Sequence, residues 1–154
     1  MPYTIRSATP QDETALSKLL PLLADFVVPN NRNPKDLWYG DYKLMKKSLA
    51  GKAENTSILL AADNMDNAIA IAMYTLKPDI LSGATGAHLE AVAVHPDHTR
   101  QGIARDLIAA CTDAAKQQGA SFMSLNVFSN NVSARALYKA CEFDEELIRC
   151  YKII

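Results

Sequence analysis

The chain has 154 residues, a length that predicts one domain over residues 1–154 and no separate cofactor domain. Its apolar share of 49% and charged share of 21% allow a sizeable core and exclude the composition of disordered chains. The net charge is -1, with no basic stripe or tail. We therefore expect neither nucleic acid nor an anionic membrane as a partner.

The three cysteines are Cys111, Cys141 and Cys150, and none of them forms a C-x-x-C pair. This pattern predicts small buried hydrophobic residues in a reducing compartment, without a disulfide framework or a thiolate metal site. Residues 1–10 contain no apolar stretch of the kind found in signal peptides, and no apolar run reaches the length of a membrane span. We expect a cytoplasmic protein.

The first half of the chain predicts a strand over residues 3–8, followed by a helix that starts at Thr9-Pro10. Pro21 must kink or end this helix, because its ring removes a backbone donor. A weaker helix is predicted over 37–49, closed by Gly51. Two apolar strands, 57–63 and 68–77, flank a four-residue turn, so we expect an antiparallel hairpin.

The second half alternates strands with stronger helices. Residues 88–94 are almost continuously apolar, which indicates a strand covered on both faces. A helix is predicted from Gly102 to Gly119, then a strand over 123–127, a short helix over 131–140 and a final strand over 147–154. The helix from Gly102 to Gly119 is long enough to bring the chain back in the same direction, so the strands before and after it are predicted to be parallel.

The junction from Val92 to Arg105 joins the buried strand to this helix through a turn that contains proline. The first helical N–H groups are unpaired there, and Gly102 and Ala104 allow a ligand close to the backbone. The junction predicts an anion site, most naturally for a pyrophosphate, and the alternative is an ordinary strand-to-helix turn. It contains neither the nucleotide P-loop sequence nor the dinucleotide fingerprint.

Two motifs resemble those of the GNAT superfamily of acetyl-CoA-dependent N-acetyltransferases. Residues 99–104 match the pattern Arg/Gln-x-x-Gly-x-Gly/Ala at Gly102 and Ala104, with Thr99 departing at its first position. Residues 131–143 resemble Asn-x-x-Ala-x-x-Leu-Tyr-x-x-x-Gly-Phe, with Glu142 in the place of the glycine. The opening residues 5–12 are also typical of the family. The resemblance covers nearly the whole chain and is densest over 88–143.

The resemblance implies a mixed α/β (α+β) fold of three layers. A central, twisted, mostly antiparallel sheet would contain a splayed parallel strand pair, in the order strand-helix-helix-strand-strand-strand-helix-strand-helix-strand. Many family members end in two strands, but only about eleven residues follow Phe143, which is enough for one. We therefore expect the last strand to be absent or supplied by a partner subunit, which makes a homodimer one arrangement.

The resemblance also implies the reaction. An acetyl group would move from acetyl-CoA to a primary amine by direct attack in a ternary complex, without a metal. A small-molecule amine is favoured as the substrate. The alternatives are a protein N-terminus or lysine as the substrate, a regulatory module that binds CoA without turnover, and a small α/β domain used only for protein contacts.

Glu90 and Tyr138 are the expected catalytic residues. Glu90 lies in an apolar strand, where desolvation would favour its protonated form and suit it to act as a base. Strand alternation places it on the face of Val92 and Val94, and the alternative is a carboxylate that is solvated or paired with an arginine. Tyr138 would protonate the leaving thiolate, or else be a packed core tyrosine. His88 is a secondary candidate for the base.

The other expected site residues bind the cofactor or the substrate. The cofactor-binding residues are expected to supply backbone amides, polar contacts and an oxyanion donor. By resemblance, the oxyanion donor lies within 92–94, where the family strand bulges. The cofactor-binding residues are Val92, Ala93, Val94, Arg100, Gln101, Gly102, Ile103, Ala104, Arg105, Asn126, Asn131 and Ala134. The asparagines could equally satisfy local backbone.

The resemblance implies a substrate pocket formed by residues 26–42 and 78–87. Its aromatic faces and carboxylates could attract a cationic amine. The more favoured alternative is that the aromatic side chains anchor a helix and the carboxylates are solvated. The substrate candidates are Phe26, Trp38, Tyr42 and His88, and the nearby carboxylates are Asp25, Asp36 and Asp41. The pair His95 and His98 lies in a proline turn, and we predict no metal site there.

Overall fold

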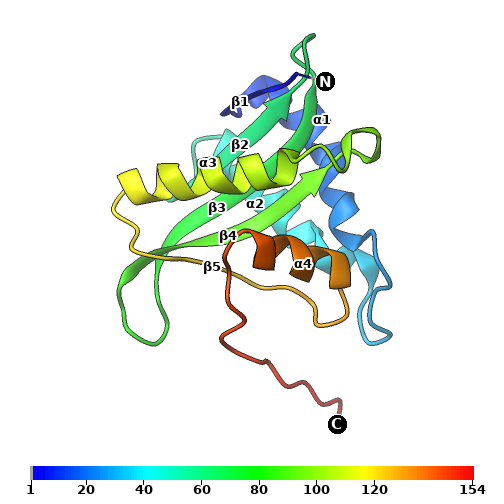
Figure 1. Cartoon of the computed structure of the whole chain (residues 1–154), viewed down its shortest axis with the longest axis vertical. Helices are drawn as coiled ribbons and strands as arrows, with labels where there is room; N and C mark the ends of the chain where they lie inside the picture. The colour runs from blue at the N-terminus through cyan, green and yellow to red at the C-terminus, as the bar shows by residue number, and fades with distance from the viewer. Residues whose placement is uncertain (1) are drawn as a thin grey trace.

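Five strands form one sheet in chain order, β1-β2-β3-β4-β5, in a computed structural model that describes residues 2–154 (Figure 1). The strands are β1 (Thr4–Ser7), β2 (Thr56–Ala62), β3 (Ala68–Pro78), β4 (Thr85–Val94) and β5 (Met123–Leu125). β1 to β4 pair antiparallel, and β5 pairs parallel to β4. The predicted hairpin and the predicted parallel pair are both confirmed.

Within residues 2–154, four α-helices accompany the sheet: α1 (Glu13–Leu19), α2 (Tyr39–Leu49), α3 (Ile103–Gln117) and α4 (Val132–Ala140). Short 3-10 helices lie at η1 (Pro10–Asp12), η2 (Leu20–Ala24), η3 (Pro34–Leu37) and η4 (Pro96–His98). As predicted, α1 ends just before Pro21, because the chain continues there as a 3-10 helix. Gly51 follows α2 with a positive φ of 73°.

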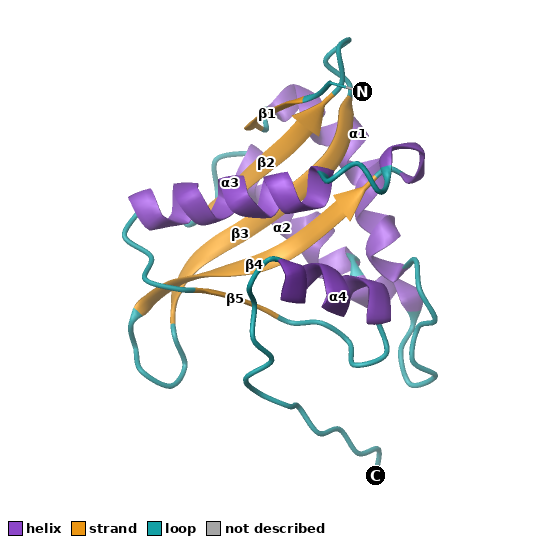
Figure 2. Cartoon of the chain, in the orientation of Figure 1, coloured by secondary structure: helices purple, strands orange, loops and turns teal. Residues whose placement is uncertain are grey.

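The helices lie in two layers, one on each face of the sheet (Figure 2). On one face, Leu107 and Cys111 of α3 pack with Tyr74 and Leu89 in one core cluster. On the other face, α1 and α2 enclose a second cluster. Buried side chains on both faces of the central strands explain why their sequences are almost continuously apolar. The three-layer mixed fold expected from the sequence is confirmed.

β4 contains a bulge at Glu90. Its neighbours Leu89 and Ala91 lie opposite consecutive residues of β3, Tyr74 and Met73, so Glu90 has no residue opposite it. The extra residue shifts the alternation of side chains, and Leu89 and Val92 therefore pack into the same cluster. Two predictions were wrong for this reason: the bulge does not lie within 92–94, and Glu90 does not share the face of Val92 and Val94.

The C-terminal segment departs from the prediction. Residues 144–154 form no strand, and they extend away from the sheet (Figure 1). The start of this segment is held by two hydrogen bonds from Arg135 to Glu145 of 2.6 and 2.8 Å. Near its end the ring of Tyr151 contacts the guanidinium group of Arg32, 4.5 Å from the ring centroid. Between these contacts Ile148 is 92% exposed, and Cys150 is exposed rather than buried as expected. The alternating sequence favours a strand, but a strand forms only where it finds a paired edge.

Glu142 occupies the turn after α4 with a positive φ of 68°. This left-handed conformation is the one that glycine adopts without strain, and the N–H of Phe143 closes the turn by donating to the carbonyl of Tyr138 at 3.0 Å. We expect Glu142→Gly to raise the free energy of unfolding by about 1 kcal/mol and Tm by about 2–4 °C. Thermal denaturation would measure this change, and a lower Tm would contradict it.

Candidate active site

A cavity of about 110 Å³ opens where β4 and β5 separate. The two strands pair only as far as Leu89 and Leu125, and β4 then continues to Val94 without a strand on that side. The cavity is lined by residues 89–92 of β4 and by residues 126–128, which follow β5. Side chains of both helical layers reach it, because the sheet no longer separates the layers at this point.

Tyr138 of α4 lines this cavity, together with Ala134 one helical turn earlier. Its ring packs edge-on against Phe143, with the ring centroids 5.9 Å apart. Burial, and to a smaller extent the nearby Cys141, raises the pKa of the Tyr138 phenol above its usual value. The hydroxyl is therefore a proton donor at neutral pH, and it bonds to no other group within residues 2–154.

Glu90 lines the same cavity, but its carboxylate is not an isolated buried charge. Lys77 of β3 places its ammonium nitrogen 3.1 Å from Glu90 Oε1. The side chain of Glu90 is 18% exposed and that of Lys77 is 48% exposed. An ion pair therefore replaces the unpaired carboxylate expected from the sequence, and the partner is a lysine rather than an arginine. Lys77 was missed because its backbone pairs with Gly86, four residues before Glu90, and only its long side chain brings the ammonium to that carboxylate.

Asp41 is a second carboxylate in the cavity. It belongs to the first turn of α2 and is partly buried. Burial raises the pKa of Asp41 to about 7, the negative charge of Glu90 adds to the increase, and the positive charge of Lys77 opposes it. The sequence placed Asp41 only among the carboxylates of the substrate region. The cavity is therefore lined by two carboxylates, Asp41 from α2 and Glu90 from β4, and the ammonium group of Lys77 lies next to the second of them.

The turn before α3 presents free backbone donors. No N–H group from Thr99 to Arg105 donates a hydrogen bond to any residue of the described range 2–154. Gly102 has a φ of 79°, and Arg100 is also left-handed with a φ of 61°. A Cβ added at Gly102 would meet no atom within 4 Å, so the space in front of the turn is open. Ile103 points its side chain into the core and can offer only its amide.

The other expected cofactor residues divide between the cavity and the core. Val92, Asn126 and Asn131 line the cavity. Asn131 Oδ1 also accepts from the N–H of Ala134 at 3.3 Å, so it caps α4, as the local alternative predicted. Ala93 and Val94 pack instead into the two core clusters.

Of the expected substrate residues, Phe26 lines the cavity, where its ring lies 5.8 Å from that of Phe128. Trp38 and Tyr42 do not line it. They pack edge to face at 6.2 Å, and Tyr42 contacts the core beneath α2. This arrangement agrees with the alternative in which the aromatic side chains anchor the helix.

His88 also lies outside the cavity lining, and its Nδ1 is 2.8 Å from the hydroxyl of Ser124 in β5. Burial lowers the pKa of His88, Lys77 lowers it further, and Glu90 opposes both effects. A neutral imidazole that is bonded to a neighbouring strand holds β4 and β5 together near the point where they separate.

Asn130, which was not predicted, makes a long-range contact next to two residues that line the cavity, Phe26 and Asn131. Its Nδ2 donates to the carbonyl of Val27 at 2.6 Å, which joins the segment before α4 to the segment after η2. No local pattern signals this contact, because the two residues lie 103 positions apart.

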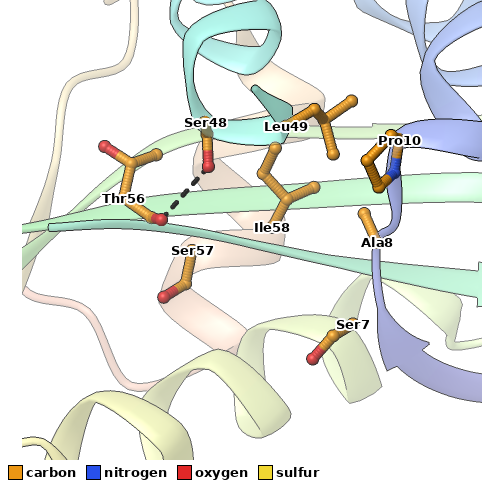
Figure 3. Close-up of a pocket in the computed structure, with 8 residues that line it drawn as sticks. All are labelled: Ser7, Ala8, Pro10, Ser48, Leu49, Thr56, Ser57 and Ile58. Carbon is orange, nitrogen blue, oxygen red and sulfur yellow. Dashed lines mark hydrogen bonds between the residues drawn. The ribbon is translucent and has the colours of Figure 1, made fainter. Parts of the chain in front are cut away.

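A second pocket, of about 250 Å³, lies between β2, the end of α2 and the start of η1 (Figure 3). Ser48 donates there to the carbonyl of Thr56 at 3.2 Å. Its lining contains serine, threonine, alanine, proline, leucine and isoleucine, and none of the expected site residues. With no ionisable side chain, this pocket offers no acid or base.

Residues 2–154 show neither a metal-binding cluster nor a membrane-spanning helix. No three side chains of His, Cys, Asp or Glu gather closely enough there to hold a metal ion. None of the helices in that range combines the length and the apolar character needed to cross a bilayer.

The sequence profile of the acetyltransferase (GNAT) family matches residues 21–143. The chain belongs to the GNAT family. Two departures from the family pattern, Thr99 and Glu142, leave the local structure in place: the turn before α3 keeps its free amides, and the turn after α4 closes in spite of the missing glycine.

The chain is also similar to a curated bacterial acetyltransferase. The chain is 34% identical over 79 residues to the [ribosomal protein bS18]-alanine N-acetyltransferase of Escherichia coli strain K12, a match that covers 51% of each chain. The matched part thus spans about half the length of that curated relative.

Many solved structures share the fold. A putative acetyl transferase from Pyrococcus furiosus has a TM-score of 0.79 at 18% identity, covering 99% of this chain and 100% of that one. The enzyme AAC(6')-Iy, solved with the bisubstrate analogue CoA-S-monomethyl-acetylneamine, has a TM-score of 0.74 at 21% identity, covering 100% and 99%.

Proposed function

We propose that this GNAT protein is an N-acetyltransferase that moves the acetyl group of acetyl-CoA to a primary amine by direct attack in a ternary complex. The observation that carries the proposal is the row of free amides from Thr99 to Arg105 at the N-terminus of α3. Unpaired N–H groups at the positive end of a helix dipole stabilise a pyrophosphate, and coenzyme A contains one.

The residues present fit coenzyme A. Gly102 has a left-handed φ and open space in front of it, so phosphate oxygens can approach the amides closely. The pantetheine arm would then follow β4 past Val92 toward the cavity, where Asn126 and Ala134 are available to contact it. A structural neighbour, AAC(6')-Iy, binds a CoA-based bisubstrate analogue, which supports this placement.

The cavity residues would divide the chemistry between them. As the amine nitrogen forms a bond to the thioester carbon, negative charge develops on the carbonyl oxygen, and an outward-facing amide of β4 beyond Leu89 would donate to it. The carbon–sulfur bond then breaks, and the phenol of Tyr138 would give its proton to the thiolate. The nitrogen of the new amide loses its second proton at this stage, and that proton would restore the phenol directly or through solvent. Glu90, paired with Lys77, would set the charge beside the attacking amine.

A small cationic amine is the proposed substrate. The cavity is small, and it contains Asp41 and Glu90, both of which attract a positive charge. A second candidate is the N-terminal amine of a protein, favoured by the similarity to the ribosomal-protein alanine N-acetyltransferase. A homodimer and one domain over residues 1–154 remain predictions.

Acetyl-CoA is expected to stabilise the protein against heat in a saturable way, because it would bind the folded state alone. At about 100 times its Kd the stabilisation would reach about 2.7 kcal/mol. A shift in Tm measured by differential scanning fluorimetry checks this, with adenosine as a control that carries no pyrophosphate. No shift at millimolar acetyl-CoA would contradict the proposed cofactor.

Thiol release from acetyl-CoA, assayed over amines, polyamines, aminoglycosides and peptides, then separates the alternatives. Turnover with a small amine supports the favoured substrate, and turnover only with peptides supports a protein substrate. A shift in Tm without turnover on any of them would instead indicate the regulatory module.

A further inference from the structure

We propose that Asp41, rather than Glu90, is the group that takes the proton from the substrate ammonium before it attacks. The inference deepens the proposed function and rests on it. Asp41 belongs to α2, on the side of the sheet opposite to Tyr138, and both residues line the one cavity where β4 and β5 separate. An amine held in this cavity would lie between a carboxylate and a phenol that enter from opposite layers.

The pairing of Glu90 limits its use as a base. Its oxygen Oε1 already contacts the ammonium of Lys77 at 3.1 Å, so this oxygen is not free to accept from a substrate ammonium. Asp41 forms no ion pair and no hydrogen bond with other residues of the described range 2–154. Both of its oxygens are therefore free to accept from a substrate.

The charges around Asp41 come from two strands. Glu90 on β4 repels its negative charge, and Lys77 on β3 attracts it. His88, two residues before Glu90, interacts with the same pair, and its lowered pKa keeps it neutral at pH 7. The phenol of Tyr138 faces the cavity from α4 and is also neutral.

Burial, with the repulsion from Glu90, brings the pKa of Asp41 to about 7. A base is most effective when its pKa is near the working pH, since it is then both deprotonated and able to hold a proton. The step balances simply. One proton passes from the ammonium nitrogen to an Asp41 oxygen and leaves a neutral amine with a free electron pair, and the proton later returns to solvent.

The test compares Asp41→Asn with Asp113→Asn, an equivalent change at an exposed position on α3. For Asp41→Asn we expect kcat to fall about 100-fold. In the wild type, the profile of kcat against pH should rise through about pH 7, because the base works only when deprotonated. This rising limb of the profile should disappear in Asp41→Asn. Asp113→Asn should keep both the rate and the limb.

Two further variants move the limb in opposite directions. Glu90→Gln removes the repelling charge and leaves Lys77 unpaired, so the limb should shift to lower pH while turnover persists. Lys77→Met removes the attracting charge and should shift it to higher pH. If Asp41 had only a structural role, the rising limb of the pH profile would stay at its wild-type pH in both Glu90→Gln and Lys77→Met.

Three outcomes would overturn the assignment. A limb that persists in Asp41→Asn, even with a raised KM, would make Asp41 only a charge partner of the substrate. Loss of the limb in Glu90→Gln would return the role of base to Glu90. Unfolding of Asp41→Asn is detected by Tm, and in that case an unmoved limb in both Glu90→Gln and Lys77→Met counts against the proposal. Wild-type protein without any turnover would instead refute the proposed function.

Discussion

Replacing Tyr138 by Phe is expected to lower kcat about 100-fold while acetyl-CoA still binds with nearly the wild-type Kd. The change removes one oxygen atom and keeps the ring, so the edge-on contact with Phe143 survives. What is lost is the proton that the phenol would give to the thiolate as the carbon–sulfur bond breaks. Steady-state kinetics, together with a thermal-shift titration of acetyl-CoA, separates the two quantities.

Tyr151→Phe is the matched control for this experiment. It removes the same atom from a tyrosine in the exposed C-terminal segment, and it should leave kcat unchanged. A better leaving thiolate needs less help from an acid, so an activated thioester should lose less of its rate in Tyr138→Phe than acetyl-CoA does. An unchanged kcat for acetyl-CoA in this variant would make Tyr138 a packing residue.

Replacing Gly102 by Val is expected to weaken acetyl-CoA binding at least 10-fold. The left-handed φ of 79° is costly for a branched side chain, so the turn would change its conformation and turn its amides away from the pyrophosphate. If the turn kept its native conformation, the valine side chain would occupy the open space in front of the turn, where the pyrophosphate would bind. Titration of the change in Tm with acetyl-CoA measures the loss.

Gly51→Val provides the comparison, because Gly51 has a φ of 73° and open space around its Cα, but follows α2 instead of preceding α3. Both variants should lose a similar amount of stability, about 1–2 kcal/mol. Only Gly102→Val should lose affinity for acetyl-CoA. Equal affinity in the two variants would exclude the turn before α3 as the cofactor site.

Local sequence determined most of the elements of this protein. The Thr9-Pro10 start, the end of α1 before Pro21 and the start of α3 after Gly102 depend on capping and on backbone geometry within a few residues. The periods of apolar residues also separated strands from helices correctly up to residue 140. Motif spacing indicated the GNAT family, which the match over residues 21–143 shows.

Tertiary structure alone decided which charges surround the cavity and whether residues 147–154 form a strand. The bulge at Glu90 reversed the expected face, and the long side chain of Lys77, whose backbone pairs with Gly86, reached that carboxylate along the sheet. Asp41 came to the cavity from α2, 49 residues before Glu90 in sequence. A strand over 147–154 did not form, although its pattern favours one. Alternation and capping are properties of neighbouring residues, whereas a pKa or a paired edge depends on groups that only folding brings together.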